Sequence, residues 1–325
     1  MLELFKRNTF FSILLLIPYA SILHIGSWLV PIPQTMSEQA WLYRHTLGQL
    51  PQTGTPGVLL SILLIVIQAG LLGRIVSQYK LNPDGQLFGS LFFILFCGFH
   101  FSTLSVNPVL FANVFFTFGI NELFKLYARK SVALPLYNFG FFIGLAAAIY
   151  PAYYIYILLG VFGITVLRGI GIREVLQLIG GFLNVFALLF AVLYLLDLHQ
   201  EYWNIQIAGY FSPYAFSMNI QGIGWVAFGL LILFLLICLG HYQFFQNKRG
   251  IQVQKQIDLL FWALLGSLLS LFFLEIDQVS HLTVLFTPLC LLCGLWITRF
   301  KNPLISETIH LFLVISSLFL QFQNW

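Results

Sequence analysis

Charged residues are scarce in this sequence. Only 8% of its 325 residues are Asp, Glu, Lys or Arg, whereas a soluble globular domain carries about a quarter. Hydrophobic residues make up 59%, which is more apolar surface than a water-soluble fold of this length can hide. The composition therefore excludes a soluble domain. The basic residues also form no stripe with interleaved aromatics, which excludes nucleic acid as a partner.

Cysteine is equally rare, with four residues in the whole chain: Cys97, Cys238, Cys290 and Cys293. All four lie inside apolar runs, where a thiol behaves as a small hydrophobic packing group. The spacing Cys290-x-x-Cys293 is also found in metal sites, but one such pair inside an apolar helix is weak evidence. We expect these cysteines to serve in packing.

The N-terminal sequence does not fit a cleavable signal peptide well. Lys6 and Arg7 precede an apolar stretch that continues to about Val30. This stretch is longer than the ~7–15 residues of a signal-peptide core and lacks a small-x-small cleavage site. It predicts an uncleaved first membrane span.

The sequence is rich in apolar runs of about 20 residues, the length that a helix needs to cross a bilayer. Eleven such runs are bounded by charges or turn residues, so the predicted fold class is an all-α, polytopic transmembrane helical bundle forming one integral domain over residues 1–325. The predicted spans are residues 9–30, 57–79, 86–104, 108–125, 134–150, 152–168, 174–196, 221–240, 257–274, 281–298 and 304–321.

The positions of Lys and Arg predict the orientation. With the N-terminus in the cytoplasm and the C-terminus outside, fourteen of the 15 basic residues fall on the cytoplasmic side, and only Arg44 lies outside. This distribution satisfies the positive-inside rule. The predicted location is the bacterial inner (cytoplasmic) membrane, where the chain is a multi-pass protein in contact with membrane lipids.

Small and polar residues predict how the spans pack. Gly140, Gly144 and Ala148 recur every fourth residue, which is typical of a ridge that lets a neighbouring helix approach closely. Gln68, Asn113 and Asn184 lie deep in apolar runs, where an amide is more often an interhelical hydrogen-bond group than a substrate contact.

Three connections are long enough to carry a function. The outer segment 31–56 contains a predicted amphipathic surface helix from Ser37 to Leu50, with Ser37 as its N-cap. The outer segment 197–221 is rich in aromatics and amides, and the inner segment 241–256 reads as a basic, solvated turn.

Acids and histidines gather on the predicted outer face. They could supply a general base or ligands for a divalent cation. Alternatively, the positive-inside bias removes Lys and Arg from this face and leaves the acids by default. The residues are Glu38, His45, His100, Asp197, His199, Glu201, Glu275, Asp277 and His281.

Glu38 is the most informative member of this group. It is the only acid in the first outer segment, and Arg44 and His45 follow it as candidate partners. The alternative interpretation is an acid in the first turn of the helix capped by Ser37, favoured there by the helix dipole.

Two further patterns involve acids and histidines. In Asp197-x-His199-x-Glu201 an extended chain would place all three side chains on one face, but a metal site would lack a fourth ligand. Asp277 and His281 are four residues apart, which favours a local carboxylate–imidazole pair on one helix face.

Two resemblances concern function. The segments NPVLFANVFFTFGINELFKLYARKS, NFGFFIGLAAAIYP and ITVLRGIGIREV resemble a family of uncharacterised multi-span inner-membrane proteins of Bacteroidota, which implies localisation and little else. The order of an N-in first span, an outer loop with an acid, and hairpins with an x-x-Gly-Leu-Ala-x-x-x-x-Pro element is similar to the GT-C glycosyltransferases. This outer loop is short, holds one acid, and is not followed by a large soluble domain.

The resemblance to GT-C enzymes implies transfer of a sugar from a polyprenyl-phosphate-linked donor on the outer face, in cell-envelope biogenesis. Glu38 is the one residue that could match their outer-loop carboxylate, as a base or a contact to a divalent metal ion. His45, Asp197, His199 and Asp277 would be supporting polar groups.

Two other functions stay open. One is a non-enzymatic scaffold that binds other membrane proteins in an envelope-assembly or secretion complex. The other is a transporter, which is disfavoured because no Asp, Glu, Lys or Arg lies clearly at mid-membrane.

Overall fold

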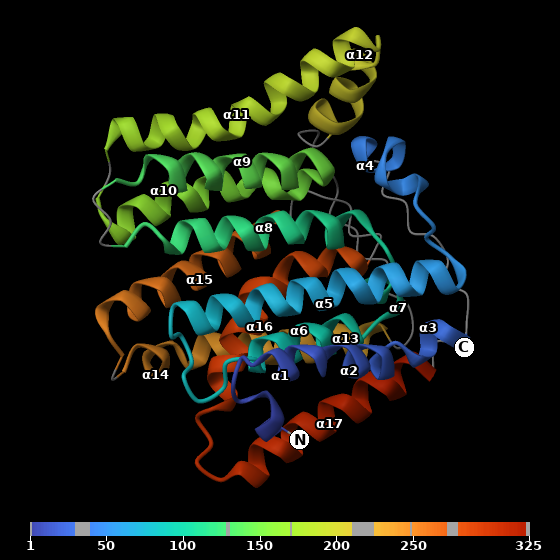
Figure 1. The fold of residues 1–325 in the computed structure, drawn as a ribbon, viewed down its shortest axis with the longest axis vertical. Coiled ribbons are helices and arrows are strands. Elements are labelled where there is room, and N and C mark those ends of the chain that lie inside the picture. Colours follow the sequence, from blue (N-terminus) through green and yellow to red (C-terminus); the bar gives the residue numbers. More distant parts are fainter. Residues whose placement is uncertain are drawn as a thin grey trace.

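The structure is a computed structural model that describes residues 2–29, 40–127, 131–169, 171–209, 224–247, 249–271 and 279–322. Every element in these ranges is a helix (Figure 1). The predicted fold class is therefore confirmed as all-helical. The principal helices are α5 (Gly54–Gln78), α6 (Phe88–Cys97), α8 (Pro108–Phe124), α9 (Ala133–Ile149), α10 (Tyr156–Leu167), α11 (Ile172–Leu195), α13 (Gly224–Gly240), α15 (Ile251–Ser270), α16 (Thr283–Ile297) and α17 (Pro303–Phe322).

Short helices fill the remaining segments. The predicted first span is broken into three pieces, and the inner segment 241–256 is partly helical instead of a simple solvated turn, because α14 occupies its start and α15 begins six residues before the predicted span. The short elements are η1 (Leu2–Phe5), α1 (Phe10–Leu14), α2 (Leu16–Leu23), α3 (Ile25–Leu29), α7 (Phe101–Leu104), η3 (Pro151–Ile155), α14 (Tyr242–Gln246) and η5 (Val279–Leu282).

Local sequence explains where several helices begin. The side chain of Asn107 accepts a hydrogen bond from the Leu110 amide at 2.8 Å, and Pro108 occupies the first turn of α8. Thr9 caps α1 in the same way, accepting from the Ser12 amide at 3.2 Å. Both caps satisfy amides that have no partner within the helix.

The long helices run side by side, and successive ones point in opposite directions (Figure 1). One end of the bundle carries the turns rich in Lys and Arg, including Lys6, Arg168 and Lys301, and is called the inner end here. The opposite end carries α3, α7 and the segment 197–209, and is called the outer end.

Helices α6 and α16 form the centre of the bundle. Every residue of both is buried. They cross closely because two glycines meet: a Cβ added to Gly294 would lie 2.4 Å from the amide nitrogen of Gly89. A larger residue at either position would push the two central helices apart.

The predicted small-residue ridge is confirmed on α9, which packs against α11. A Cβ added to Gly140 would lie 2.1 Å from the carbonyl oxygen of Leu178, and one added to Gly181 on α11 would lie 2.1 Å from that of Tyr137. Gly144 faces Val185 on the same surface. The two backbones are thus in direct contact, as small residues at helix crossings allow.

The buried amides join helices, as predicted. Asn113 on α8 donates to Gln68 on α5 at 3.1 Å and accepts from Thr287 on α16 at 2.9 Å. Gln68 also donates to the carbonyl of Leu110 at 3.0 Å. Asn184 donates to the Tyr137 hydroxyl between α11 and α9. Each amide therefore has a partner inside the apolar core, where an unpaired one would be costly.

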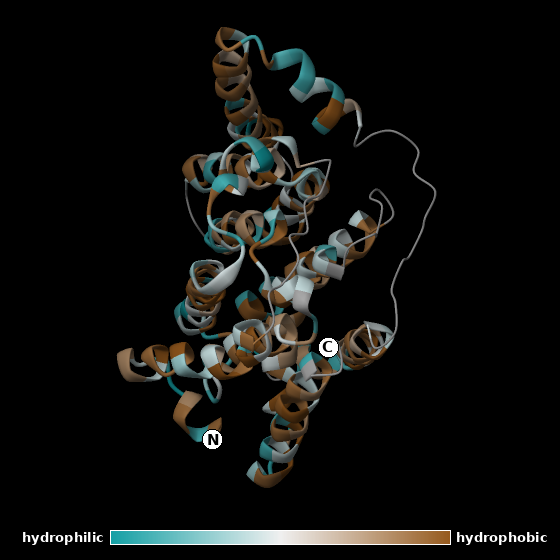
Figure 2. Cartoon of the chain, turned by 90° about the vertical axis from the view of Figure 1, so that its right-hand side faces the viewer, coloured by the Kyte–Doolittle hydropathy of each residue, from teal (hydrophilic) through white to brown (hydrophobic). Residues whose placement is uncertain are grey.

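Four described helices are long and apolar enough to cross a membrane: Gly54–Gln78, Ile172–Leu195, Ser280–Ile297 and Pro303–Gln321. Hydrophobic colour covers most of the helices in the end-on view of Figure 2, and hydrophilic colour is dense near the top, at α12. Large apolar side chains are exposed on the periphery, among them Phe10, Ile172 and Leu195. A soluble protein rarely exposes so large an apolar surface.

Candidate functional site

The predicted outer residues divide into two groups. Glu38 and Asp277 lie outside the described residues. His45, Asp197 and His199 all lie at the outer end, on α4 (Trp41–His45) and on the turn and short helices that follow α11. Those short helices are α12 (His199–Tyr202) and η4 (Trp203–Ala208). We call α4, α12 and η4, with the residues directly flanking them, the outer cap.

The predicted helix from Ser37 to Leu50 is wrong in its bounds. Helix α4 starts at Trp41, its N-cap position is Ala40, and a separate turn follows at Leu47–Gln49. The side chains of Trp41 and Tyr43 are each only 1% exposed. Residues 37–39 of the predicted helix lie outside the described residues. Helix α4 packs into the protein through these two rings.

The side chain of Gln206 forms hydrogen bonds that join the two outer segments. The Gln206 amide is fully buried, and its oxygen accepts a hydrogen bond from the backbone amide of Leu42 at 3.1 Å. Its nitrogen donates to the carbonyls of Ala147, at 3.2 Å, and Ala148 at the end of α9. Gln206 therefore satisfies backbone groups that the ends of α4 and α9 leave open.

Aromatic packing completes the cap. The ring of Trp41 meets that of Tyr202 edge-on, with centroids 5.6 Å apart, and both pack with Leu193 of α11. Burial raises the pKa of the Tyr43 and Tyr202 phenols. Both phenols therefore stay protonated at neutral pH, and neither is suited to act as a base.

His45 occupies the exposed end of α4. Its ring stacks on that of Trp41 with centroids 4.0 Å apart, and its Nδ1 lies 2.9 Å from the Trp41 carbonyl oxygen. The other ring nitrogen, Nε2, is on the side away from this contact. These two contacts hold the His45 ring in one orientation. Its Nε2 could contact a substrate.

Asp197 and His199 have different surroundings. Asp197 adopts a left-handed backbone conformation, with φ of 56°, in the turn that ends α11. Asp tolerates this conformation better than most residues, so its position has a structural reason. The ring of His199 lies 5.1 Å from that of Tyr194, and its Nδ1 is buried without a hydrogen-bond partner in the described part of the chain.

The structure does not assemble these residues into a metal site. Among the described residues, no group of three or more His, Cys, Asp or Glu side chains could hold a metal ion. The pattern Asp197-x-His199-x-Glu201 therefore does not act as a ligand set there. The predicted pair of Asp277 and His281 lies partly outside the described residues. The Nδ1 of His281 is 2.7 Å from the Tyr150 hydroxyl oxygen.

The cysteines behave as the sequence predicts. All four are free and buried, and they come from α6, α13 and α16. The sulfurs of Cys238 and Cys293 lie 3.7 Å apart. They are packing residues at the centre of the bundle.

The role of Gln206 and a large cavity were not predicted from the sequence. The cavity has a volume of about 540 Å³ and lies at the inner end, far from the outer cap. No sequence pattern pointed to Gln206, because its hydrogen-bond partners are backbone atoms. The basic residues Lys6, Arg7 and Lys301, which line the cavity, could have pointed to it. In the sequence they are equally well explained by the positive-inside rule.

Comparison with known proteins adds no relative. No model of a protein family matches this chain, and no curated protein is similar to it in sequence. The functional conclusion therefore rests on the residues and their geometry.

Proposed function

We propose that this protein crosses the bacterial inner membrane eleven times and acts at its outer face in cell-envelope biogenesis, on a polyprenyl-phosphate-linked sugar. The alternating direction of the helices and the collection of Lys and Arg at one end support the topology (Figure 1). With this orientation the outer cap faces the compartment in which the lipid-linked sugar would be used.

The observation that carries this proposal is the joining of the two outer segments by Gln206. Residue 38 precedes the buried Ala40 by two positions, and α4 follows directly. The hydrogen bond from the Leu42 amide to Gln206 fixes the start of α4 beside α12 and η4. In the sequence Glu38 therefore lies three residues before α4 and the cap that also holds His45 and His199.

In the proposed reaction Glu38 acts as the base. It takes the proton of an acceptor hydroxyl, whose oxygen forms a bond to C1 of the sugar. The bond from C1 to the phosphate oxygen breaks, and polyprenyl phosphate leaves with the electron pair. His45, whose ring stacks on Trp41, and His199 both belong to the outer cap. In the proposed reaction they position the acceptor or the leaving phosphate. Asp197 would add a polar contact there, and Asp277, which lies outside the described residues, is the remaining supporting group predicted from the sequence.

Native mass spectrometry of the gently solubilised protein tests this proposal. The wild type should retain a polyprenyl-phosphate-linked species and transfer its sugar to an added acceptor, and Glu38→Gln should retain the species without transfer. Glu3→Gln is the matched control, because Glu3 is an exposed acid at the opposite end of the bundle. Full transfer by Glu38→Gln would refute the role of Glu38.

A scaffold is the second candidate, and α11 favours it. This helix buries only Leu178, Gly181, Val185 and Leu193, and the rest of its surface is largely exposed and apolar. Such a face could bind lipid or another membrane protein. A stoichiometric protein partner without any lipid-linked sugar, in the same mass spectra, would favour the scaffold over the transferase.

A further inference from the structure

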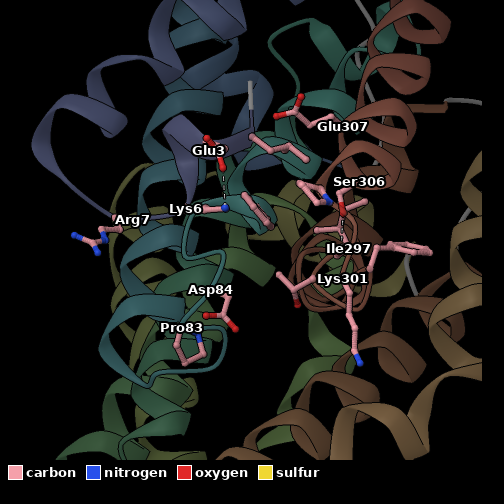
Figure 3. Close-up of a pocket in the computed structure, with 14 residues that line it drawn as sticks. Glu3, Lys6, Arg7, Pro83, Asp84, Ile297, Lys301, Ser306 and Glu307 are labelled. Atoms are coloured by element: carbon pink, nitrogen blue, oxygen red, sulfur yellow. Dashed lines mark hydrogen bonds and ion pairs between the residues drawn. The ribbon is translucent and has the colours of Figure 1, made fainter.

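The cavity of about 540 Å³ at the inner end lies between three parts of the chain. Glu3, Lys6 and Arg7 come from η1 and the residues after it, and Pro83 and Asp84 come from the loop before α6. The turn between α16 and α17 forms the opposite wall with Ile297, Lys301 and Ser306 (Figure 3). Residues distant in the sequence thus share one charged cavity.

Hydrogen bonds fix the walls of this cavity. The amides of Gln86 and Leu87 donate to the carbonyls of Lys6 and Phe5, at 3.0 and 3.3 Å. Asn82 donates to the Gly294 carbonyl at 2.8 Å, which ties the loop to α16. Ser306 donates to the Ile297 carbonyl at 3.2 Å. Because the backbone is held on all three sides, the cavity is a built feature of the fold.

The acids near the cavity already have partners. Lys6 lies 3.2 Å from the Glu3 carboxylate, which Figure 3 shows as a dashed line. Asp84 lies near Arg249, which donates to the Leu81 carbonyl, and Glu307 is engaged with another group. Arg7 and Lys301 form no ion pair with any described residue. They leave positive charge on opposite walls.

We propose that this cavity binds the phosphate group of a membrane phospholipid at the inner face. Arginine and lysine are the side chains that recognise phosphate, and the planar guanidinium can donate two parallel hydrogen bonds. In Figure 3 the two side chains lie on opposite sides of the cavity and point away from each other, so a bound phosphate would require both to change rotamer.

The source of the phosphate follows from the surroundings. The cavity lies where α1 and α17 start, and both helices expose large apolar side chains close to it, including Phe10, Phe11 and Leu304. Acyl chains would contact these apolar residues while the headgroup entered the charged cavity. This site does not depend on the reaction proposed at the outer cap.

The experiment uses the full chain in nanodiscs of phosphatidylethanolamine and phosphatidylglycerol in equal amounts, followed by native mass spectrometry. The wild type should retain one phospholipid molecule. Arg7→Gln/Lys301→Gln should reduce this retention by about tenfold or more, since two charge-assisted hydrogen bonds are lost.

Arg173→Gln/Lys255→Gln is the matched control. It removes the same charge from the same end of the bundle, at residues that do not line the cavity, and it should retain the lipid. Arg7→Lys should recover most of the retention, and a thermal unfolding scan confirms that each variant is folded. Equal lipid retention by the two double variants would overturn the site.

A second arm identifies the source of the phosphate group. Inorganic phosphate is added to the delipidated protein in an uncharged detergent. No change in unfolding temperature is expected at millimolar concentration. A rise that Arg7→Gln/Lys301→Gln abolishes would overturn the lipid as ligand and assign the cavity to a soluble phosphate compound.

Discussion

The two ends of this bundle are stabilised by different means. At the outer end, buried amides satisfy open backbone groups: Gln206 joins α4 to α9, and Gln321 joins the break between α2 and α3 to the end of α6. At the inner end, ion pairs such as Glu122–Lys125 and Arg168–Glu174 hold the turns.

This difference follows from the distribution of charge. Lys and Arg are concentrated at one end of the bundle, so acids there find partners. At the opposite end, Lys and Arg are few. Neutral amide side chains there bond the backbone groups that helix ends leave without a partner. The described part of the outer end is consequently held by specific amide contacts, whereas the inner end keeps an open, charged cavity. Three variants separate these contributions.

The largest effect should come from Gly181→Leu, because α9 and α11 connect the two ends. A Cβ at residue 181 would lie 2.1 Å from the Tyr137 carbonyl, so the helices must separate. We expect a loss of about 3 kcal/mol or more in the free energy of unfolding, measured by thermal unfolding in detergent. Gly180→Leu is the control, since nothing lies within 4 Å of its Cβ position, and an equal loss there would contradict the close packing.

Gln206→Leu should damage the outer end alone. It leaves the Leu42 amide and the carbonyls of Ala147 and Ala148 without this partner, at a cost of about 2–4 kcal/mol. Hydrogen exchange should increase in α4 and stay unchanged in η1. Gln200→Leu, an exposed glutamine on α12, should have little effect. Unchanged protection of α4 in Gln206→Leu would show that aromatic packing suffices.

Lys125→Met should have the smallest effect and act at the inner end. The Glu122 side chain is 11% exposed and that of Lys125 is 25% exposed, so the pair is partly screened and its loss should cost about 1 kcal/mol. Adding Glu122→Gln to Lys125→Met should recover most of the lost stability, because no unpaired acid remains. Chemical denaturation of the single and double variants measures both changes. A double variant less stable than the single would contradict this account.

Much of the fold could be predicted from the sequence, because long apolar runs dominate it. The predicted segments 108–125 and 134–150 match α8 and α9 to within one residue. The spacing of Gly140 and Gly144 also identified the close packing of α9, since four-residue periodicity places small residues on one helix face.

The outer cap could not be predicted in the same way. The length of α4 depends on where Trp41 and Tyr43 become buried, and this depends on α9, α12 and η4. The role of Gln206 depends on carbonyls at the end of α9, and backbone groups leave no trace in a sequence. Histidines and acids were recognised by type, but their type does not tell whether they converge.

The bonds made by Gln321 have a consequence for biosynthesis. Its side chain donates a hydrogen bond to the carbonyl of Leu23 and accepts one from the amide of Gly26. These residues lie 298 and 295 positions earlier in the chain. At a translation rate of about 5–20 residues per second, the ribosome needs roughly 15–60 s to cover that distance. During this interval the amide of Gly26 lacks its final partner. The first helices to enter the membrane are thus among the last to be completed, and a chain released before residue 321 would keep this end open to quality-control proteases.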